Sequence, residues 1–239
     1  MRSGSVKSDG VGHGEVDIDR GMRAMKTVSV ENAIKIIPDG ASLMIGGFMG
    51  VGTPEPLIDE LARQNKRNLT VIANDTAFPG RGIGKLISAK LVSRTIASHI
   101  GLNPETQQQM IDGTMVVDLV PQGTLIERIR AGGAGLGGIL TPTGVGTVIA
   151  DGKPTFDIDG RSYLVEPALK ADFALVGAFL ADYLGNLSYA LTSRNFNPVI
   201  AMAGATTIVC AEYIVPVGVI PPDNVITPAA LVDYLVAKG

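Results

Sequence analysis

The chain has 239 residues, of which 46% are hydrophobic and 18% charged, with 30 glycines and no tryptophan. This length suits one large α/β domain or two small ones, and the net charge of −3 without a dense basic block argues against a nucleic-acid partner. No apolar stretch approaches the ~20 residues of a membrane span, and the single cysteine, Cys210, excludes an internal disulfide and favours a cytoplasmic location.

The first residues differ in composition from the rest of the chain. They are polar and rich in glycine, show no apolar period, and lack the hydrophobic region of a signal peptide. We therefore expect residues 1–25 to form a disordered leader or a cloning remnant, and residues 26–239 to form one domain.

The hydrophobic period then alternates between strand-like and helix-like segments. The expected elements are, in chain order, a helix from Ser29 or Val30 to Pro38, a strand over Ser42–Ile45, a helix from about Pro54, strands over Leu69–Ala73 and Leu91–Ser98, a helix over Pro104–Ile111, a strand over Met115–Val120 and a helix over Thr124–Arg130. This repetition predicts the α/β class, with an open, mainly parallel sheet flanked by helices.

The second half of the chain is less regular. The stretch 131–146 carries seven glycines and a proline, so we expect a long irregular loop there. The further expected elements are a hairpin of Thr155–Ile158 and Arg161–Val165, buried strands over Phe173–Val176 and Thr206–Cys210, and a closing helix over Pro228–Val236. Cys210 ends an apolar strand, which indicates a buried core residue rather than a nucleophile.

A glycine-rich turn follows the first buried strand. Four glycines fall within residues 46–52, and Pro54 then begins a helix-like segment. Glycine permits positive φ and close approach of a ligand to the backbone. The turn has neither the G-K-[ST] of a phosphate-binding loop nor the G-x-G-x-x-G of a dinucleotide loop, so it predicts neither phosphate nor NAD binding. The alternative to a ligand-binding turn is a tight strand-to-helix turn that binds no ligand.

Polar residues recur where the predicted strands end. They are Gly46-Gly47, Asn74-Asp75, His99 and Gln122. The carboxyl ends of parallel strands meet at one edge of a sheet, where ligands bind in open α/β folds. The spacing therefore places these four loops around one crevice.

Several of these segments also resemble the alpha-type half of the family I coenzyme A (CoA) transferases. The matching segments are Asp39-Gly40, the G-G-F-x-x-x-G-x-P string at 46–54, Asn74-Asp75, Ser98-His99-Ile100-Gly101, Pro121-Gln122-Gly123-Thr124, the R-A-G-G-A-G string at 130–135, Thr141-Pro142-Thr143-Gly144 and the S-R-N-F-N string at 193–197. The resemblance covers residues 26–239 and implies a CoA-transferase-like fold of the sugar-phosphate isomerase type.

The resemblance implies that CoA moves between carboxylates through a glutamyl-CoA thioester. In the family, the glutamate lies in an S-E-N-G-like motif on the beta-type half, and this chain has no such motif. Its nearest string, S-V-E-N at 29–32, lies at a predicted helix start. A glutamate such as Glu31 commonly occupies the first turn of a helix, where it stabilises the helix N-terminus. The other glutamates considered, which also lack a glycine-rich context, are Glu105, Glu127, Glu166 and Glu212. We therefore expect an alpha subunit that is inactive without a beta subunit.

The resemblance also implies roles for individual residues. Gln122 and Asn74 would contact the substrate carboxylate or thioester oxygen, since neutral amides stabilise developing negative charge. The backbone amides of a CoA-contacting loop would face the thioester, and its residues are Gly46, Gly47, Phe48, Met49, Gly50, Val51 and Gly52.

Five further polar residues receive no catalytic role. Asp75 departs from the Asn-Asn pair of the succinyl-CoA:3-oxoacid branch, and His99 is expected to be a hydrogen-bonded strand-end residue. Arg194, Asn195 and Asn197 are expected to form a structural hydrogen-bond network or a subunit contact.

The G-L-G-G-I-L string at 135–140 resembles the acetate/acetoacetate type of the family. It contains no cationic residue that could neutralise the second carboxylate of a dicarboxylate substrate. The expected substrates are CoA thioesters and short monocarboxylates, namely acetate, butyrate and acetoacetate, with no permanently bound cofactor and no metal. The expected partner is a separate beta chain in an α2β2 heterotetramer, contacted through residues 132–146. The alternatives are a succinyl-CoA:3-oxoacid transferase subunit, a non-catalytic acyl-CoA or sugar-phosphate sensor, and an isomerase-like enzyme related by fold alone.

Overall fold

A computed structural model describes residues 26–238, so the predicted leader lies outside the described residues. The strands are β1 (Lys26–Thr27), β2 (Ser42–Ile45), β3 (Leu69–Asp75), β4 (Val92–His99), β5 (Val116–Leu119), β6 (Gly138–Thr141), β7 (Thr155–Ile158), β8 (Arg161–Pro167), β9 (Ala171–Asp182), β10 (Leu187–Ser188), β11 (Gly204–Val215) and β12 (Tyr234–Ala237). The α-helices are α1 (Val30–Lys35), α2 (Glu55–Arg63), α3 (Gly84–Ser88), α4 (Pro104–Ile111), α5 (Gln122–Gly133) and α6 (Asn197–Ala203).

The main sheet has the order β1-β12-β11-β9-β2-β3-β4-β5, and all these neighbours pair in parallel. The strand order runs in opposite directions on the two sides of the β2–β9 pair. Such a reversal is the topological switch point at which open α/β sheets bind ligands. The glycine-rich turn leaves the end of β2, so the fold places it at this point.

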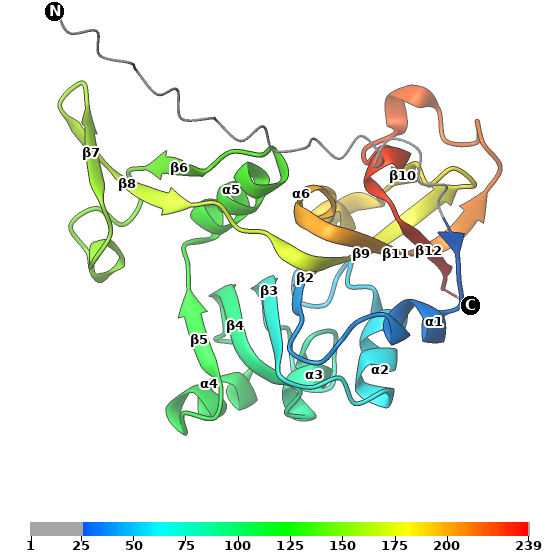
Figure 1. The fold of residues 1–239 in the computed structure, drawn as a ribbon, viewed down its shortest axis with the longest axis horizontal. Helices are drawn as coiled ribbons and strands as arrows, with labels where there is room; N and C mark the ends of the chain where they lie inside the picture. Colours follow the sequence, from blue (N-terminus) through cyan, green and yellow to red (C-terminus); the bar gives the residue numbers. More distant parts are fainter. Residues whose placement is uncertain (1–25, 239) are drawn as a thin grey trace, which may run out of the picture.

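Helices cover both faces of the sheet (Figure 1). On one face, α1, α2 and α3 pack on a core that includes Leu43 and Ile45, while on the other face α5 and α6 pack on a core that includes Met44. Adjacent strand residues point to opposite faces, so a strand buried on both sides has to be apolar throughout. The predicted open, mainly parallel α/β sheet is confirmed.

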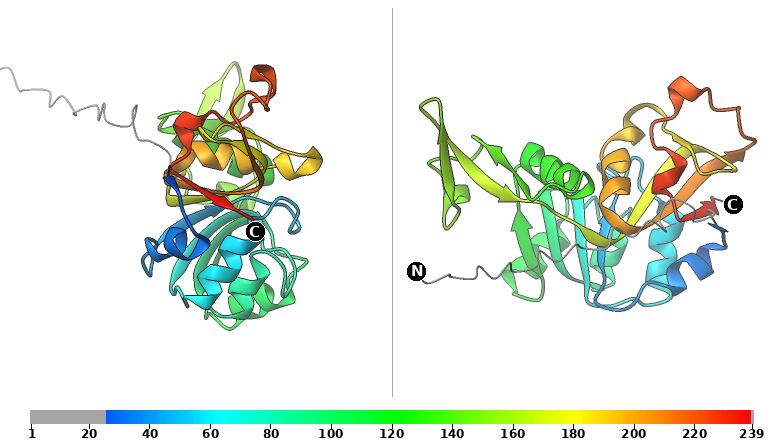
Figure 2. Two further views of the ribbon diagram at one scale, coloured as in Figure 1. Left: turned by 90° about the vertical axis from the view of Figure 1, so that its right-hand side faces the viewer. Right: turned by 45° about the horizontal axis from the view of Figure 1, so that its top comes forward.

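A three-stranded antiparallel sheet in the order β6-β8-β7 projects from the main body as an arm (Figures 1 and 2). The predicted hairpin is confirmed, with Asp159 and Gly160 both at positive φ in its turn. The prediction of an irregular loop over 131–146 was wrong in part. The last turn of α5 occupies 131–133, and β6 pairs with β8 despite its glycine.

The closing helix predicted over Pro228–Val236 was also wrong. A short 3₁₀ turn at Ala229–Leu231 precedes β12, which pairs in parallel with β11. Leu235 and Val236 are both buried, and they belong to the cores on opposite faces of the sheet. Strand geometry buries two consecutive side chains on two faces, so tertiary packing overrode the helical propensity of the Ala-Ala-Leu segment.

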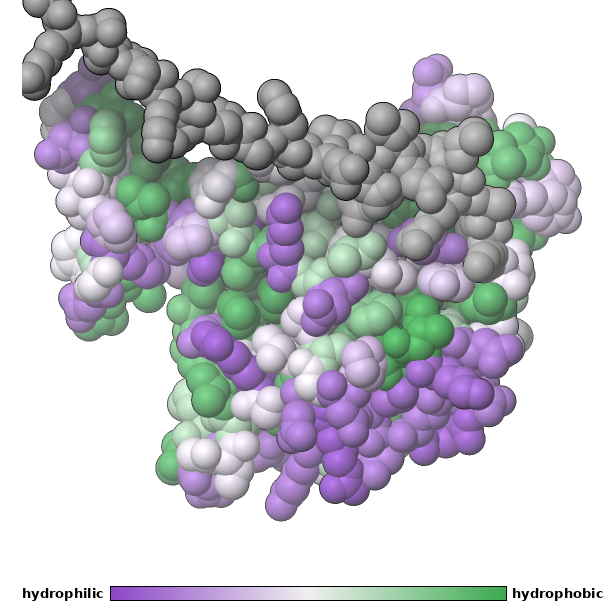
Figure 3. Space-filling view, in the orientation of Figure 1, coloured by the Kyte–Doolittle hydropathy of each residue, from purple (hydrophilic) through white to green (hydrophobic). Residues whose placement is uncertain are grey.

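The two ends of the molecule differ in surface character. Figure 3 shows hydrophilic residues over α1 and α2, and hydrophobic residues along the left-hand side of the view, on the arm and near β5. The exposed apolar side chains of those two regions include Leu136, Leu140, Val148, Phe156, Val116 and Leu119. None of the helices in residues 26–238 has the length and apolar character needed to cross a membrane.

Candidate active site

A cavity of about 850 Å³ opens beside the glycine-rich turn at the switch point. Its lining residues are Phe48, Met49, Val51, Asn74, Phe78, Arg81, Gln122, Thr192, Asn195 and Phe196. They come from the turn after β2, the end of β3 and the loop that follows it, the start of α5, and the segment before α6. The lining is mostly apolar with a few convergent amides, as is typical of small-molecule sites.

Asn74 and Gln122, which the sequence placed at two strand ends, lie in direct contact. Gln122 Nε2 donates a hydrogen bond to Asn74 Oδ1 (2.8 Å), and Ser98 Oγ shares its proton between the Asn74 backbone carbonyl (2.7 Å) and the same Oδ1 (3.0 Å). Two donors on one carbonyl fix the plane of the Asn74 amide. Within residues 26–238 the Asn74 amide nitrogen donates no hydrogen bond, so it remains available as a donor to a ligand.

The glycine-rich turn folds into a small hairpin of its own. The backbones of Phe48 and Val51 exchange two hydrogen bonds, at 3.0 and 2.9 Å, around Met49 and Gly50. Both central residues have positive φ, 52° and 83°, as in the tightest two-residue turns. The side chains of Phe48 and Val51 therefore stand exposed on the cavity wall.

Asn195 and Asp75 hold this hairpin in place through hydrogen bonds to its backbone. Asn195 Oδ1 accepts from the Gly47 amide (3.1 Å), and its Nδ2 donates to the Val51 carbonyl (2.9 Å). The buried Asp75 carboxylate accepts from the Met49 amide (2.7 Å). The expected structural network of the S-R-N-F-N string is present at Asn195 and Asn197, whereas the Arg194 side chain makes no hydrogen bond within residues 26–238. Asp75, for which no role was predicted, anchors the hairpin as well.

The same bonds leave few hairpin amides for a ligand. The amides of residues 46–49 and 51 all donate within the chain. Those of Gly50 and Gly52 donate no hydrogen bond to the described residues. The predicted CoA-contacting role of the loop would therefore rest on two amides and on the exposed Phe48 and Val51 side chains.

His99 does not join the crevice that the spacing predicted. Adjacent strand residues point to opposite faces, so Ser98 faces Asn74 while the imidazole of His99 lies over Gly101, outside the cavity lining. Within residues 26–238 the imidazole makes no side-chain hydrogen bond, contrary to the expected bonded strand-end residue. Ser98, which sequence reasoning missed, takes the polar role at this strand end.

A second cavity of about 410 Å³ lies across the hairpin from the first. Val51 and Arg81 line both cavities, so the hairpin and the loop after β3 separate them. Cys210 contributes to the second cavity but is only 4% exposed, and burial raises the pKa of its thiol to about 11. The expectation of a buried core cysteine is confirmed.

The raised pKa predicts an unreactive thiol. At pH 8 only about 10⁻³ of a thiol with this pKa is ionised, and only the thiolate reacts with alkylating agents. Cys210 in the folded protein should react with iodoacetamide roughly 10²-fold more slowly than in the urea-unfolded chain, measured by mass spectrometry over time. Equal rates in the two states would contradict the burial of this residue.

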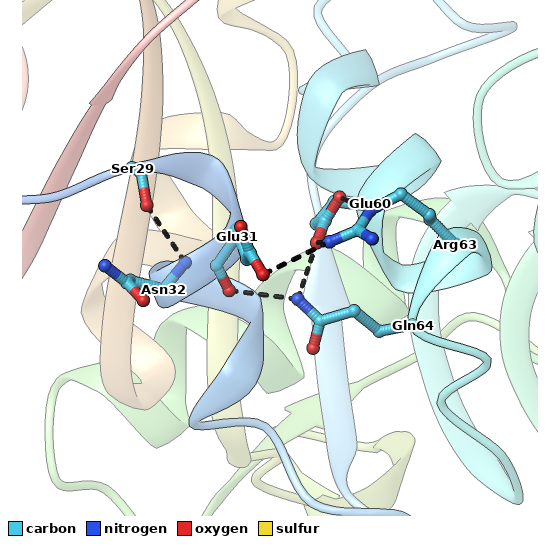
Figure 4. Close-up of polar contacts among 6 residues, drawn as sticks. All are labelled: Ser29, Glu31, Asn32, Glu60, Arg63 and Gln64. Atoms are coloured by element: carbon cyan, nitrogen blue, oxygen red, sulfur yellow. Dashed lines mark hydrogen bonds and ion pairs between the residues drawn. The ribbon is translucent and has the colours of Figure 1, made fainter.

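Glu31, in the S-V-E-N string, lies in a helix cap. Ser29 Oγ accepts from the Asn32 amide (3.2 Å), and Glu31 forms an ion pair with Arg63 of α2 at 3.6 Å (Figure 4). Gln64 also bonds to the Glu31 carbonyl. Glu31 thus lies in the first turn of a capped helix, as the sequence predicted, and its exposed carboxylate pairs with α2.

The larger cavity has no acidic residue in its lining among the described residues. Two glutamates, Glu55 and Glu212, line the smaller cavity, and both form ion pairs, with Lys85 at 2.7 Å and Lys238 at 2.8 Å. Buried Glu166 pairs with Lys153 at 2.5 Å, in the arm region. The amide pair therefore has no carboxylate nucleophile beside it in this part of the chain.

Comparison with known proteins assigns this site to a family. The coenzyme A transferase family profile matches residues 27–238. The chain belongs to this family. The acetate CoA-transferase subunit alpha of Escherichia coli K12 is 53% identical over 89% of this chain and 97% of that protein. The acetoacetyl-CoA:acetate/butyrate CoA transferase alpha subunit of Clostridium acetobutylicum is 48% identical over 89% and 98%.

A solved structure agrees with this assignment. The acyl-CoA transferase of E. coli O157:H7, determined as a thioester complex with CoA, is 26% identical with a TM-score of 0.80. The match covers 90% of the present chain and 47% of that one, so this CoA-transferase chain spans about half the length of its structural relative. The predicted family I alpha subunit, a CoA-transferase enzyme subunit, is thereby confirmed.

Proposed function

We propose that this chain is the alpha subunit of a short-chain acyl-CoA:acetate or acetoacetate CoA-transferase of the cytoplasm, active only with a beta subunit. The single observation that supports an active site divided between two chains is the lining of the larger cavity. Asn74 and Gln122 provide oriented amides there, but no carboxylate lines it within the described residues. Such a wall can position an acyl group and stabilise an oxyanion, and it needs a nucleophile from elsewhere.

The chemistry divides between the two chains. The partner's glutamate attacks the acyl-CoA carbonyl, forming a C–O bond and breaking the C–S bond, to give a mixed anhydride and CoA thiolate. The thiolate attacks the glutamyl carbonyl, which releases the first acid and leaves a glutamyl-CoA thioester. The second acid reverses these steps and regenerates the glutamate. Each attack develops negative charge on a carbonyl oxygen, where Asn74 and Gln122 donate hydrogen bonds.

Short apolar acids suit the lining of this cavity. Phe48, Val51, Phe78 and Phe196 are among the apolar residues that line it. A methylene or two changes selectivity by only ~1–3 kcal/mol, so acetate, butyrate and acetoacetate should overlap as substrates. CoA enters as a substrate thioester rather than as a resident cofactor. The alternative, a succinyl-CoA:3-oxoacid transferase subunit, differs in using a dicarboxylate.

We place the beta subunit against the arm and the adjoining edge strand, as part of an α2β2 assembly. Leu136 and Leu140 of the glycine-rich segment 132–146 are 59% and 42% exposed, and Val148 is 81% exposed. Strand β5 ends the main sheet and carries exposed Val116 and Leu119. Exposed apolar side chains that gather on one side of a molecule mark protein interfaces.

Reconstitution tests the split site. The purified chain alone should exchange no CoA between butyryl-CoA and acetate, and addition of its beta chain should establish turnover, followed by chromatography of the acyl-CoA products. Borohydride should inactivate the complex only after acyl-CoA is added, with the modified residue on the beta chain. Turnover by the isolated chain, or a covalent adduct on one of its own carboxylates, would refute the proposal.

A further inference from the structure

The side chain of Arg81 occupies the boundary between the two cavities. It lies in the loop after β3, is exposed, and lines both cavities. It also packs on the hairpin: a Cβ built on Gly50 would lie 2.6 Å from Arg81 Nε. Glycine at position 50 thus serves two needs, because it accepts positive φ and leaves room for the arginine.

Arg81 is the charged group in these linings that has no ion-pair partner among residues 26–238. The other charged residues lining either cavity are Glu55, Glu212 and Lys238, and each forms an ion pair. Within residues 26–238 the Arg81 guanidinium makes no hydrogen bond and no ion pair. The larger cavity consequently carries one positive charge, amid apolar side chains and neutral amides.

A permanent, unpaired guanidinium at a largely apolar cavity selects for oxyanions. Arginine stays charged at all physiological pH values, and its planar donors match a carboxylate. Low-dielectric walls focus the field of such a charge and raise the local concentration of an anionic substrate. A small acid combines the two features that this wall offers to bind, a short apolar tail and one carboxylate.

We propose that Arg81 captures the carboxylate of the free acid substrate at the cavity mouth, before the acid reaches the Asn74–Gln122 amides. This inference rests on the proposed function. Capture and chemistry are separate tasks here: the cation binds the anionic acid, while the neutral amides stabilise the oxyanion without trapping the acid in a salt bridge. Arg81 is therefore a specificity residue, and its removal should change binding of the acid rather than the rate of acyl transfer.

Steady-state kinetics of the reconstituted complex test this division. In Arg81→Gln, the KM for acetate should rise about fivefold to tenfold with kcat and the KM for butyryl-CoA little changed, because loss of the cation slows association of the anionic acid without altering the chemical step. Arg81→Lys should recover most of the loss. The difference from wild type should shrink at high salt, as expected for an exposed charge.

A matched control removes an exposed arginine elsewhere. Arg67 precedes β3, at the opposite edge of the sheet, and its side chain makes no ion pair within the described residues. Arg67→Gln changes the net charge equally and should leave all constants at their wild-type values. Thermal unfolding of each variant complex would verify that it is folded.

A second measurement does not depend on turnover. Phenylglyoxal should modify Arg81 in the assembled protein, and acetate should slow this modification several-fold, as measured by peptide mass spectrometry. If the wild-type complex protects Arg81 with acetate yet transfers no CoA, the proposed function fails while the capture site stands.

Three results would overturn the inference. The first is an unchanged KM for acetate in Arg81→Gln, in a complex that turns over, together with no protection by acetate. The second is a loss confined to succinate, which would assign Arg81 to the distal carboxylate of a dicarboxylate. The third is a rise in the KM for butyryl-CoA that disappears with butyryl-pantetheine, which would assign it to the CoA phosphates.

Discussion

Replacement of Gln122 by alanine should lower kcat of the reconstituted transferase by on the order of 10²–10³, the cost of removing one oxyanion-hole donor. Gln122 contacts Asn74 Oδ1 at 2.8 Å and so fixes the amide that donates to the substrate. The variant therefore loses the Gln122 amide donor, and the Asn74 amide is no longer held in place by it. The KM for acyl-CoA should change much less, since the interaction strengthens only as charge develops.

The hydrogen bond between the two amides makes a further test possible. If Gln122 and Asn74 act as one unit, Asn74→Ala and the double variant should each be about as slow as Gln122→Ala, with a coupling energy well above zero in a double-mutant cycle. Gln108→Ala is the matched control, because Gln108 is an exposed glutamine on α4 that bonds only to Asp112. An unchanged rate in Gln122→Ala would reassign the residue to structure.

Alanine at position 46 should destabilise the protein and abolish most activity. A Cβ there would lie 1.8 Å from Asn197 Oδ1, far inside contact distance. Asn197 is fully buried and cannot retreat cheaply, because its side chain bonds to the Gly177 amide and to the carbonyls of Gly52 and Ser193. Overpacking of this kind costs about 1–3 kcal/mol, before the loss of these hydrogen bonds is counted.

The thermal midpoint of the complex should therefore fall by about 5 °C or more in Gly46→Ala. Gly123→Ala is the matched control. Gly123 lies in the first turn of α5, and a Cβ there would meet nothing within 4 Å. Alanine in a helix is favoured over glycine by roughly 0.5–1 kcal/mol, so the control should be neutral or slightly stabilising. Equal midpoints in the two variants would show that the packing at Gly46 is not required.

Most of the first half of the fold could be predicted from the sequence. Strand β2 and helix α4 have the predicted bounds, because their local signals agree with their environment. Pro104 begins α4 after the Asn103 cap, which accepts two amide hydrogens. Where local and tertiary preferences conflict, as at β12, the predicted element was wrong.

The active-site wall could be predicted only in part. Asn74, Gln122 and the glycine-rich turn lie together as the strand-end rule requires, and the coarse topology was enough for that. Ser98, for which no role was predicted, faces the site in place of His99, because strand pleating decides which of two adjacent residues does so. The sequence did not indicate a role for Arg81, since the function of a single cation in a loop depends on the residues that surround it in the folded chain.

The sequence by itself determined the α/β class, the coenzyme A transferase family and the strand ends at which polar groups gather. These follow from periodicity and from short motifs, which are properties of neighbouring residues. Only the tertiary structure decided that Asn195 and Asp75 hold the hairpin, that most of its amides are already bonded, and that Arg81 has no ion-pair partner among residues 26–238. Those facts depend on contacts between residues as far apart as 47 and 195, and such contacts exist only once the sheet has brought its strand ends together.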